Sequence, residues 1–150
     1  MPSNIDVSHP WYFRKELPVL GFALPAKVSD GELAGFLTAR DKVIRSIAEP
    51  WVVVVDISNL LASSAVQRNM CSSTEPQYAE LYKRYLVACA FVIRNSFHRG
   101  VVTAMYWLQP PVYPYHLVGS AEEGVRWVTE RFAERRSAFG RDQSVPAPNT

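Results

Sequence analysis

The sequence predicts a single α/β domain with a central mixed sheet of four to five strands and flanking helices. Two apolar runs, WVVVV at Trp51 to Val55 and LVACAFVI at Leu86 to Ile93, have no polar interruption. Such runs are typical of strands that are covered on both faces of a sheet. Segments with helical periodicity lie before, between and after them. This alternation favours parallel central strands joined by right-handed crossovers.

Length and composition indicate an ordinary globular domain. The chain has 150 residues, 48% of them hydrophobic and 20% charged, which excludes a disordered chain. A net charge of +2 is too small to make nucleic acid or an anionic membrane the expected partner. We expect no stable membrane insertion, because no apolar stretch approaches the roughly 20 residues of a spanning helix. No signal peptide is recognised, and Cys71 and Cys89 lack metal-type spacing, so a reducing cytoplasm is expected.

Composition also predicts the domain boundaries. We expect a flexible, polar N-terminus over residues 1–8 and the folded domain over residues 9–139. The last residues, RDQSVPAPNT, are typical of a disordered tail, which we expect over residues 140–150.

The N-terminal half predicts two short strands, a long helix and the first central strand. The strands are expected at Trp11 to Phe13 and at Val19 to Leu24. Ser29 and Glu32 have the spacing of a capping box, and apolar residues follow at helical intervals until a proline, which predicts a helix over residues 30–48. The central strand lies in the run WVVVVDISN from Trp51 to Asn59.

Two helical segments are predicted between the central strands. The first is a short helix at Ala62 to Met70, which Ser63 or Ser64 can cap. The residues Cys71 to Ser73 interrupt its pattern. A second start follows at Thr74 to Gln77, where a proline lies early in the helix and its missing amide does little harm.

The C-terminal third predicts a helix, a short strand and a final helix. Ser96 is the expected cap of a helix over residues 97–108, which two prolines then stop. A short strand is expected at His116 to Val118. Ser120 is the expected cap of the last helix, and Gly140 is expected to end it.

Two long stretches carry a family resemblance: VSDGELAGFLTARDKVIRSIAEPWVVVVDISNL and LVACAFVIRNSFHRGVVTAMYWLQPPVYPYHLVGSAEEGVRWVTERF. They resemble the SpoIIAA-like proteins of the STAS (anti-sigma-factor antagonist) superfamily, and more narrowly a group of small bacterial proteins. The most telling parts are the strand that ends at Asp56, the helix that leads from Arg99 through Trp107, and the helix with Trp127. The resemblance implies a STAS-like domain with a role in regulation or binding rather than catalysis.

The resemblance also makes Ser63 and Ser64 candidates for phosphorylation. Phosphorylatable antagonists of this superfamily carry an Asp-Ser-Ser-Gly turn shortly after the strand. This chain has Ala62-Ser63-Ser64-Ala65, which keeps the adjacent serines but lacks the acid and the glycine. A serine switch is therefore an alternative function with an incomplete motif.

A candidate anion site lies at the predicted carboxyl edge of the sheet. Its residues are Ser58, Asn59, Arg94, Ser96 and Arg99, which follow the two central strands. Helix N-termini present free amides and partial positive charge that can hold a phosphate or carboxylate. The same Ser and Asn residues are what helix caps require, and capping alone is the preferred interpretation. No glycine-rich phosphate loop is present.

The candidate partner-binding residues are Trp107, Tyr113, Tyr115 and His116, in a segment stiffened by prolines. Trp and Tyr are frequent interface anchors, and a stiff segment loses little entropy on binding. The alternative is that Trp107 packs on the sheet and the tyrosines cover a loop. We expect a non-enzymatic cytoplasmic regulatory or adaptor domain that binds another protein, or a second copy of itself as a homodimer. A small-molecule or lipid-binding domain is the other alternative. No catalytic residue, metal site or cofactor motif is identified.

Overall fold

The computed structural model describes residues 5–144 and contains a five-stranded mixed sheet in the order β1-β2-β3-β4-β5. The first pair is antiparallel, and β2, β3, β4 and β5 are parallel. The strands are β1 (Tyr12–Glu16), β2 (Val19–Ala23), β3 (Trp51–Asp56), β4 (Leu86–Val92) and β5 (Tyr115–Val118). The predicted single α/β domain with a mixed sheet is thereby confirmed.

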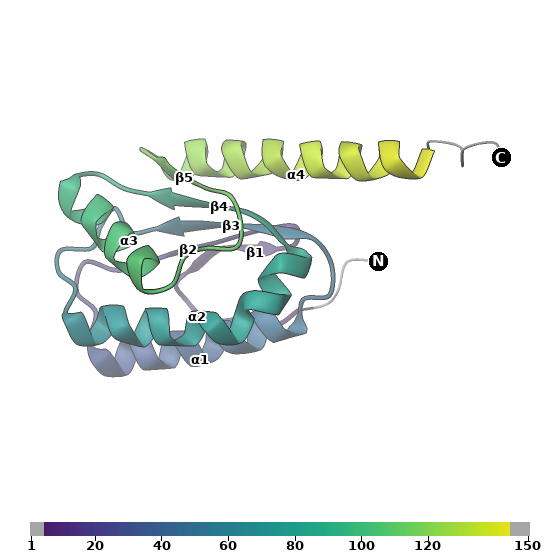
Figure 1. The fold of residues 1–150 in the computed structure, drawn as a ribbon. Coiled ribbons are helices and arrows are strands. Elements are labelled where there is room, and N and C mark those ends of the chain that lie inside the picture. The colour runs from purple at the N-terminus through teal and green to yellow at the C-terminus, as the bar shows by residue number, and fades with distance from the viewer. Residues whose placement is uncertain (1–4, 145–150) are drawn as a thin grey trace.

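Four helices cover the two faces of the sheet unequally. Three of them, α1 (Asp30–Ser46), α2 (Ala65–Tyr85) and α3 (Ser96–Leu108), lie on one face, and α4 (Ala121–Ser144) lies on the other (Figure 1). Figure 1 also shows α4 extending well past the end of the sheet. The sheet therefore separates a broad three-helix layer from a single long helix.

The central strands are apolar throughout because both of their faces are buried. Val52 and Val54 on β3 pair with Ala88 and Ala90 on β4, and all four are fully buried on the α4 side. The alternate residues, such as Val53, belong to the core beneath the three-helix layer. Successive side chains of a strand point to opposite faces, so a run without polar interruption fills both cores.

α4 packs unusually close to the sheet at Gly124. A Cβ atom on this glycine would lie 3.0 Å from Val54 Cγ1 and 3.5 Å from Ala90 Cβ. The small side chains of β4 and the missing side chain of Gly124 together allow this approach. Gly124 therefore allows α4 to pack closely on the sheet. This contact offsets the lower helix propensity of glycine.

The two helical segments predicted between β3 and β4 are one helix, so the predicted interruption at Cys71 to Ser73 is wrong. Three hydroxyls in this part of α2 donate to carbonyls one turn earlier, and the backbone stays helical. They are Ser72 Oγ to Arg68 O at 3.0 Å, Ser73 Oγ to Met70 O at 3.2 Å and Thr74 Oγ1 to Cys71 O at 2.8 Å.

Pro76 lies inside α2. A proline has no N–H and its ring crowds the preceding turn, so it bends a helix without ending it when tertiary packing holds both halves. Figure 1 shows the C-terminal part of α2 turning towards the sheet, where it leads directly into β4. The bend lets one helix both lie beside α1 and deliver the chain to the sheet.

Several predicted boundaries also differ. The first strand runs through Glu16 and not only to Phe13, because this exposed edge strand pairs with β2 despite its charged residues. α1 ends at Ser46, two residues before the expected end. α4 continues through Gly140 to Ser144, so the predicted stop is wrong, which is consistent with the cost of about 1 kcal/mol for a glycine in a helix.

The predicted flexible ends are only partly covered by the structure. Val7 is buried against the three-helix core, so the chain is packed at this point. Residues 1–4 and 145–150 lie outside the described residues.

Candidate functional site

At the carboxyl edge of the sheet, where an anion site was predicted, backbone hydrogen bonds continue the strand pairing by one residue. Amide groups that follow one strand donate to the last carbonyl of the next, as in Ile57 N to Val92 O at 3.1 Å and Ile93 N to Val118 O at 2.9 Å. Asp56 Oδ1 accepts hydrogen bonds from both the amide and the hydroxyl of Ser58, at 2.9 and 2.6 Å. Ser58 is therefore part of a local turn.

The start of α3 is capped by Asn95, so the prediction of Ser96 as the cap is wrong by one residue. Asn95 Oδ1 accepts from His98 N at 3.1 Å, while Ser96 is the first helical residue. Asn59, Arg94, Ser96 and Arg99 are all exposed. The structure thus brings the predicted residues to one edge of the sheet. Nearby, Asn95 caps α3 and Ser58 belongs to a turn. Anion binding at this edge stays a prediction.

His98 is a buried histidine that joins three segments at this edge. It is 1% exposed, its Nδ1 accepts from Arg94 N at 3.0 Å, and its Nε2 lies 2.8 Å from Leu60 O. Because Nδ1 is an acceptor, Nε2 carries the proton and donates to the carbonyl. His98 is therefore a satisfied structural residue that ties the end of β4 and the start of α3 to the loop after β3.

Ser63 and Ser64 lie at the amino end of α2. Ser64 is the cap: its Oγ accepts from Gln67 N at 3.0 Å, and Gln67 Oε1 accepts from Ser64 N at 3.3 Å. The carbonyl of Ser63 accepts from Arg68 Nη1 at 2.6 Å. The alternatives of Ser63 or Ser64 as cap are thereby resolved in favour of Ser64, and phosphorylation of either serine stays a prediction.

The four predicted partner-binding residues do not form one surface. Tyr113 is half-buried, and its hydroxyl lies 3.0 Å from that of Tyr106. Tyr115 and His116 are exposed neighbours on β5 and point to opposite faces of the sheet: the Tyr115 ring contacts Tyr106, and the His116 ring stacks on Trp127. Only Trp107 stands clear of the domain, at 85% exposure.

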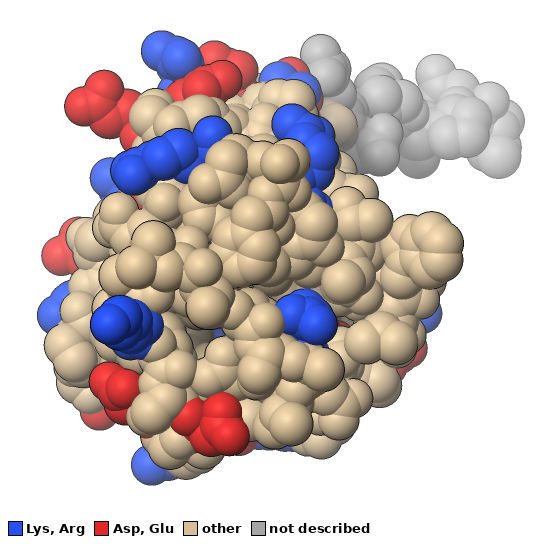
Figure 2. Space-filling view, turned by 90° about the vertical axis from the view of Figure 1, so that its left-hand side faces the viewer, with Lys and Arg blue, Asp and Glu red and all other residues tan. Residues whose placement is uncertain are grey.

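Trp107 belongs to a shallow groove along the outer side of α3, which we call the α3 surface. Leu108, beside it, is 63% exposed. Figure 2 views the end of the molecule where β3 and β4 terminate, and uncharged side chains cover most of the middle of that end. The α3 surface consists of Ser96, Arg99, Gly100, Thr103, Ala104, Trp107 and Leu108.

A cavity of about 130 Å³ lies between the sheet and the three-helix layer. Its walls are mainly apolar and come from β2, β3, β4 and all three helices. The sequence did not predict it, because its walls come from residues far apart in the chain. One signal was present: Arg40 interrupts the apolar stripe of the predicted first helix. The polar and titratable residues on its walls include Arg40, Ser63, Gln67, Arg68, Cys71, Ser72, Glu75, Tyr82, Tyr106 and Tyr113.

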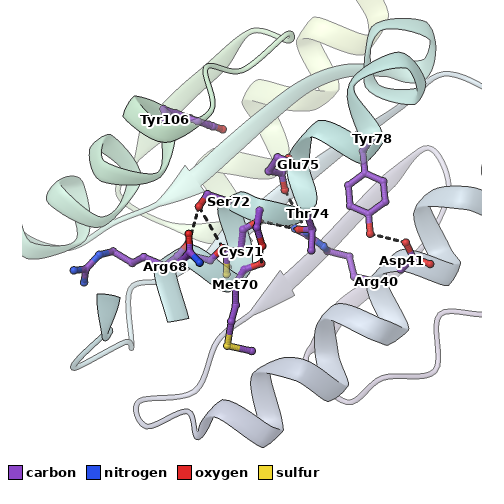
Figure 3. Close-up of polar contacts among 12 residues, drawn as sticks. Arg40, Asp41, Arg68, Met70, Cys71, Ser72, Thr74, Glu75, Tyr78 and Tyr106 are labelled. Carbon is purple, nitrogen blue, oxygen red and sulfur yellow. Dashed lines mark hydrogen bonds and ion pairs between the residues drawn. The ribbon is translucent and has the colours of Figure 1, made fainter. Parts of the chain in front are cut away.

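An ion pair between α1 and α2 forms part of the cavity wall. Arg40 Nη2 lies 3.2 Å from Glu75 Oε1 and 3.3 Å from Thr74 Oγ1, and both charged side chains are only 15% exposed (Figure 3). Arg40 Nε is buried and has no hydrogen-bond partner among the described residues. Tyr106 extends towards the same region from α3 (Figure 3). The side chain of Arg40 is therefore held by a carboxylate and a hydroxyl of α2, while its Nε atom is enclosed by protein.

The phenols and thiol near this ion pair hold their protons at neutral pH. Burial raises the pKa of Tyr12 to about 12. Burial, with a 2.6 Å hydrogen bond to Asp41, raises the pKa of Tyr78 to about 12. Burial also raises the pKa of Tyr82 and of the Cys71 thiol above their ordinary values. These groups are therefore neutral in the folded protein near pH 7.

The raised pKa of Tyr12 predicts a loss of stability in alkali. Below pH 10 the phenol is protonated in both folded and unfolded chains, whereas between pH 10 and 12 the unfolded chain loses the proton first. Urea unfolding should therefore show a free energy of unfolding that falls over this interval. In Tyr12→Phe the fall should be smaller by about 2–3 kcal/mol. Tyr115→Phe, which alters an exposed tyrosine, should follow the wild type; an equal change in both variants would contradict the prediction.

None of the helices within residues 5–144 has both the length and the apolar character needed to cross a bilayer. In the same part of the chain, no three His, Cys, Asp or Glu side chains gather closely enough to hold a metal ion.

Comparison with known proteins gives no relative: no family model, no curated protein and no solved structure matches the chain. The resemblance to the SpoIIAA-like proteins therefore stays an expectation from the residues quoted for it.

Proposed function

We propose that the chain is a non-enzymatic, STAS-like regulatory or adaptor domain of the bacterial cytoplasm that binds another protein through the α3 surface. The observation that carries this proposal is the 85% exposure of Trp107 beside a Leu108 that is 63% exposed. Isolated apolar side chains on a surface are common, but a tryptophan is rarely left in water, and it is a preferred anchor of protein interfaces.

The shape and composition of the α3 surface support this function. Gly100, Thr103, Ala104 and Trp107 follow one another at helical spacing and line one groove. The small residues leave room for a side chain of the partner next to the indole ring. Arg99 at the same groove supplies a charge at the rim, where interfaces are usually polar.

The lipid-binding alternative finds less support. A drug-sized ligand occupies a pocket of roughly 300 Å³ or more. The cavity under the three-helix layer has about 130 Å³. This volume is too small for a lipid chain and leaves the α3 surface as the better supported site.

The test begins with identification of the partner by crosslinking. A photoreactive amino acid at position 107 should give a crosslinked product in cells, whereas the same residue at Phe13, which is 42% exposed on the edge strand β1, should not. Mass spectrometry of the product identifies the partner, and a second copy of the chain would identify a homodimer.

The affinity of the purified partner then measures the contribution of the indole ring. Trp107→Ala should weaken binding at least about thirtyfold, as expected for a central anchor residue. Leu61→Ala is the matched control, because Leu61 is 67% exposed and lies outside the α3 surface. Equal affinities of the two variants, with unchanged melting temperatures, would overturn the proposal.

A further inference from the structure

The charge of the α3 surface has a single sign. Arg99 is its only charged residue, and α3 contains no Asp or Glu. Arg94, which is also exposed, lies just before this helix. Within residues 5–144, neither guanidinium group forms an ion pair with a carboxylate. The α3 surface therefore has a positive charge that the described part of the chain leaves without a partner.

The charged and apolar parts of the α3 surface lie at opposite ends of the helix. Arg99 is near its start and Trp107 near its end, so about 12 Å of helix axis separates them at 1.5 Å per residue. The residues between them on this surface are small, and a Cβ atom on Gly100 would meet nothing within 4 Å in the described part of the chain. A segment of another protein can therefore approach the backbone of α3 closely between the two ends.

A helix is the form of partner segment that suits this surface. The backbone groups in the middle of α3 are hydrogen-bonded within the helix, so an extended segment would find no free amide or carbonyl along it. A helical segment satisfies its own backbone groups and can dock an apolar stripe into a groove. Small residues at the contact also allow two helix axes to come close together.

A second copy of the chain fits the charge of this surface less well. In a two-fold symmetric contact the same surface of each copy faces the other. The α3 surface contains no carboxylate, so neither copy would supply a partner for Arg99 of the other. Charge complementarity across an interface instead favours a partner with acidic side chains.

We propose that the partner binds through an acidic amphipathic helix. A large apolar side chain of this helix packs beside Trp107, and a carboxylate about two turns away pairs with Arg99. This inference rests on the proposed function of the α3 surface and adds the chemistry of the partner.

The test uses two designed helical peptides of about 18 residues, a length at which a helix can form in water. Both have the same leucine stripe, which glutamates flank in one peptide and lysines in the other. Fluorescence anisotropy with the full chain should show that the acidic peptide binds at least about tenfold more tightly than the basic one. Equal binding of the two peptides, or no binding of either, would overturn the inference.

Three variants show whether the acidic peptide is bound at the α3 surface. Arg99→Glu should lower its affinity at least about fivefold. Arg14→Glu is the matched control, because it changes the net charge equally at an exposed residue of β1, and should change the affinity less than about twofold. Trp107→Ala should weaken binding as well. Equal losses in the two arginine variants, with unchanged melting temperatures, would mean attraction to the overall charge and would overturn the inference.

Crosslinking at position 107 separates this inference from the proposed function. A crosslinked partner segment without acidic residues, or a second copy of the chain, would contradict the acidic helix while leaving binding through the α3 surface intact. Absence of any crosslinked product would contradict the proposed function and remove the basis of this inference.

Discussion

Replacing Glu75 with alanine is expected to lower the free energy of unfolding by about 3 kcal/mol. The variant would keep the charge of Arg40 in a place where the side chain is only 15% exposed, without the carboxylate that now lies 3.2 Å away. Water can offset only part of this loss, since the cavity beside Arg40 is small and mainly apolar. Urea denaturation at pH 7 measures the change.

The control for this prediction is an ion pair at the surface. Glu80 lies 3.5 Å from Lys83, but these side chains are 90% and 57% exposed. Glu80→Ala should therefore change the free energy of unfolding by less than about 0.5 kcal/mol. Replacing the buried pair together, with Arg40→Met and Glu75→Leu, should recover most of the stability that Glu75→Ala loses. A loss in Glu75→Ala no greater than that in Glu80→Ala would show that Arg40 does not depend on its partner.

Gly124→Val is expected to cost about 2–3 kcal/mol of folding free energy. A Cβ atom at this position would lie 3.0 Å from Val54 Cγ1 and 3.4 Å from Val118 Cγ2, and both valines are buried in the sheet. The remaining methyl groups of the new valine would have to displace α4 from the sheet. Thermal and urea unfolding should both show the loss.

Gly35 provides the same substitution at an open position. It lies in the middle of α1, and a Cβ atom there would have no neighbour within 4 Å in the described part of the chain. Gly35→Val should therefore not destabilise the protein, and Gly35→Ala should stabilise it by about 0.5–1 kcal/mol through helix propensity. Equal losses in Gly35→Val and Gly124→Val would mean that β-branching in a helix, and not the contact with the sheet, causes the effect.

The parts of the fold that local sequence determines were predicted well. The capping box of Ser29 and Glu32 is present, with both hydrogen bonds at 3.0 Å. The runs at β3 and β4 form adjacent parallel strands. Each of these predictions depends on residues that lie within one or two turns or within one strand, where periodicity and capping act.

Predictions that required knowledge of distant neighbours were less accurate. The serine and threonine hydroxyls of α2 suggested a break, but packing of this helix on α1 and the sheet outweighs its weak propensity. Tyr113 and Trp107 are both aromatic residues of the segment stiffened by prolines. The half-buried Tyr113 has its hydroxyl 3.0 Å from that of Tyr106, whereas the Trp107 side chain is 85% exposed. Arg40 shows the same limit, because its partner Glu75 lies 35 residues away along the chain.

The length of α4 divides its backbone into two regions of different local stability. Among residues 121–138, whose side chains the structure describes, those that pack on the sheet or beside it end at Phe132, and residues 133–138 are exposed although they remain helical. A helical turn without tertiary contacts gains little beyond its own hydrogen bonds and opens independently of the domain. We therefore expect the amide protons around Val128 to exchange with solvent only when the whole domain unfolds, and those of residues 133–138 to exchange through local fraying.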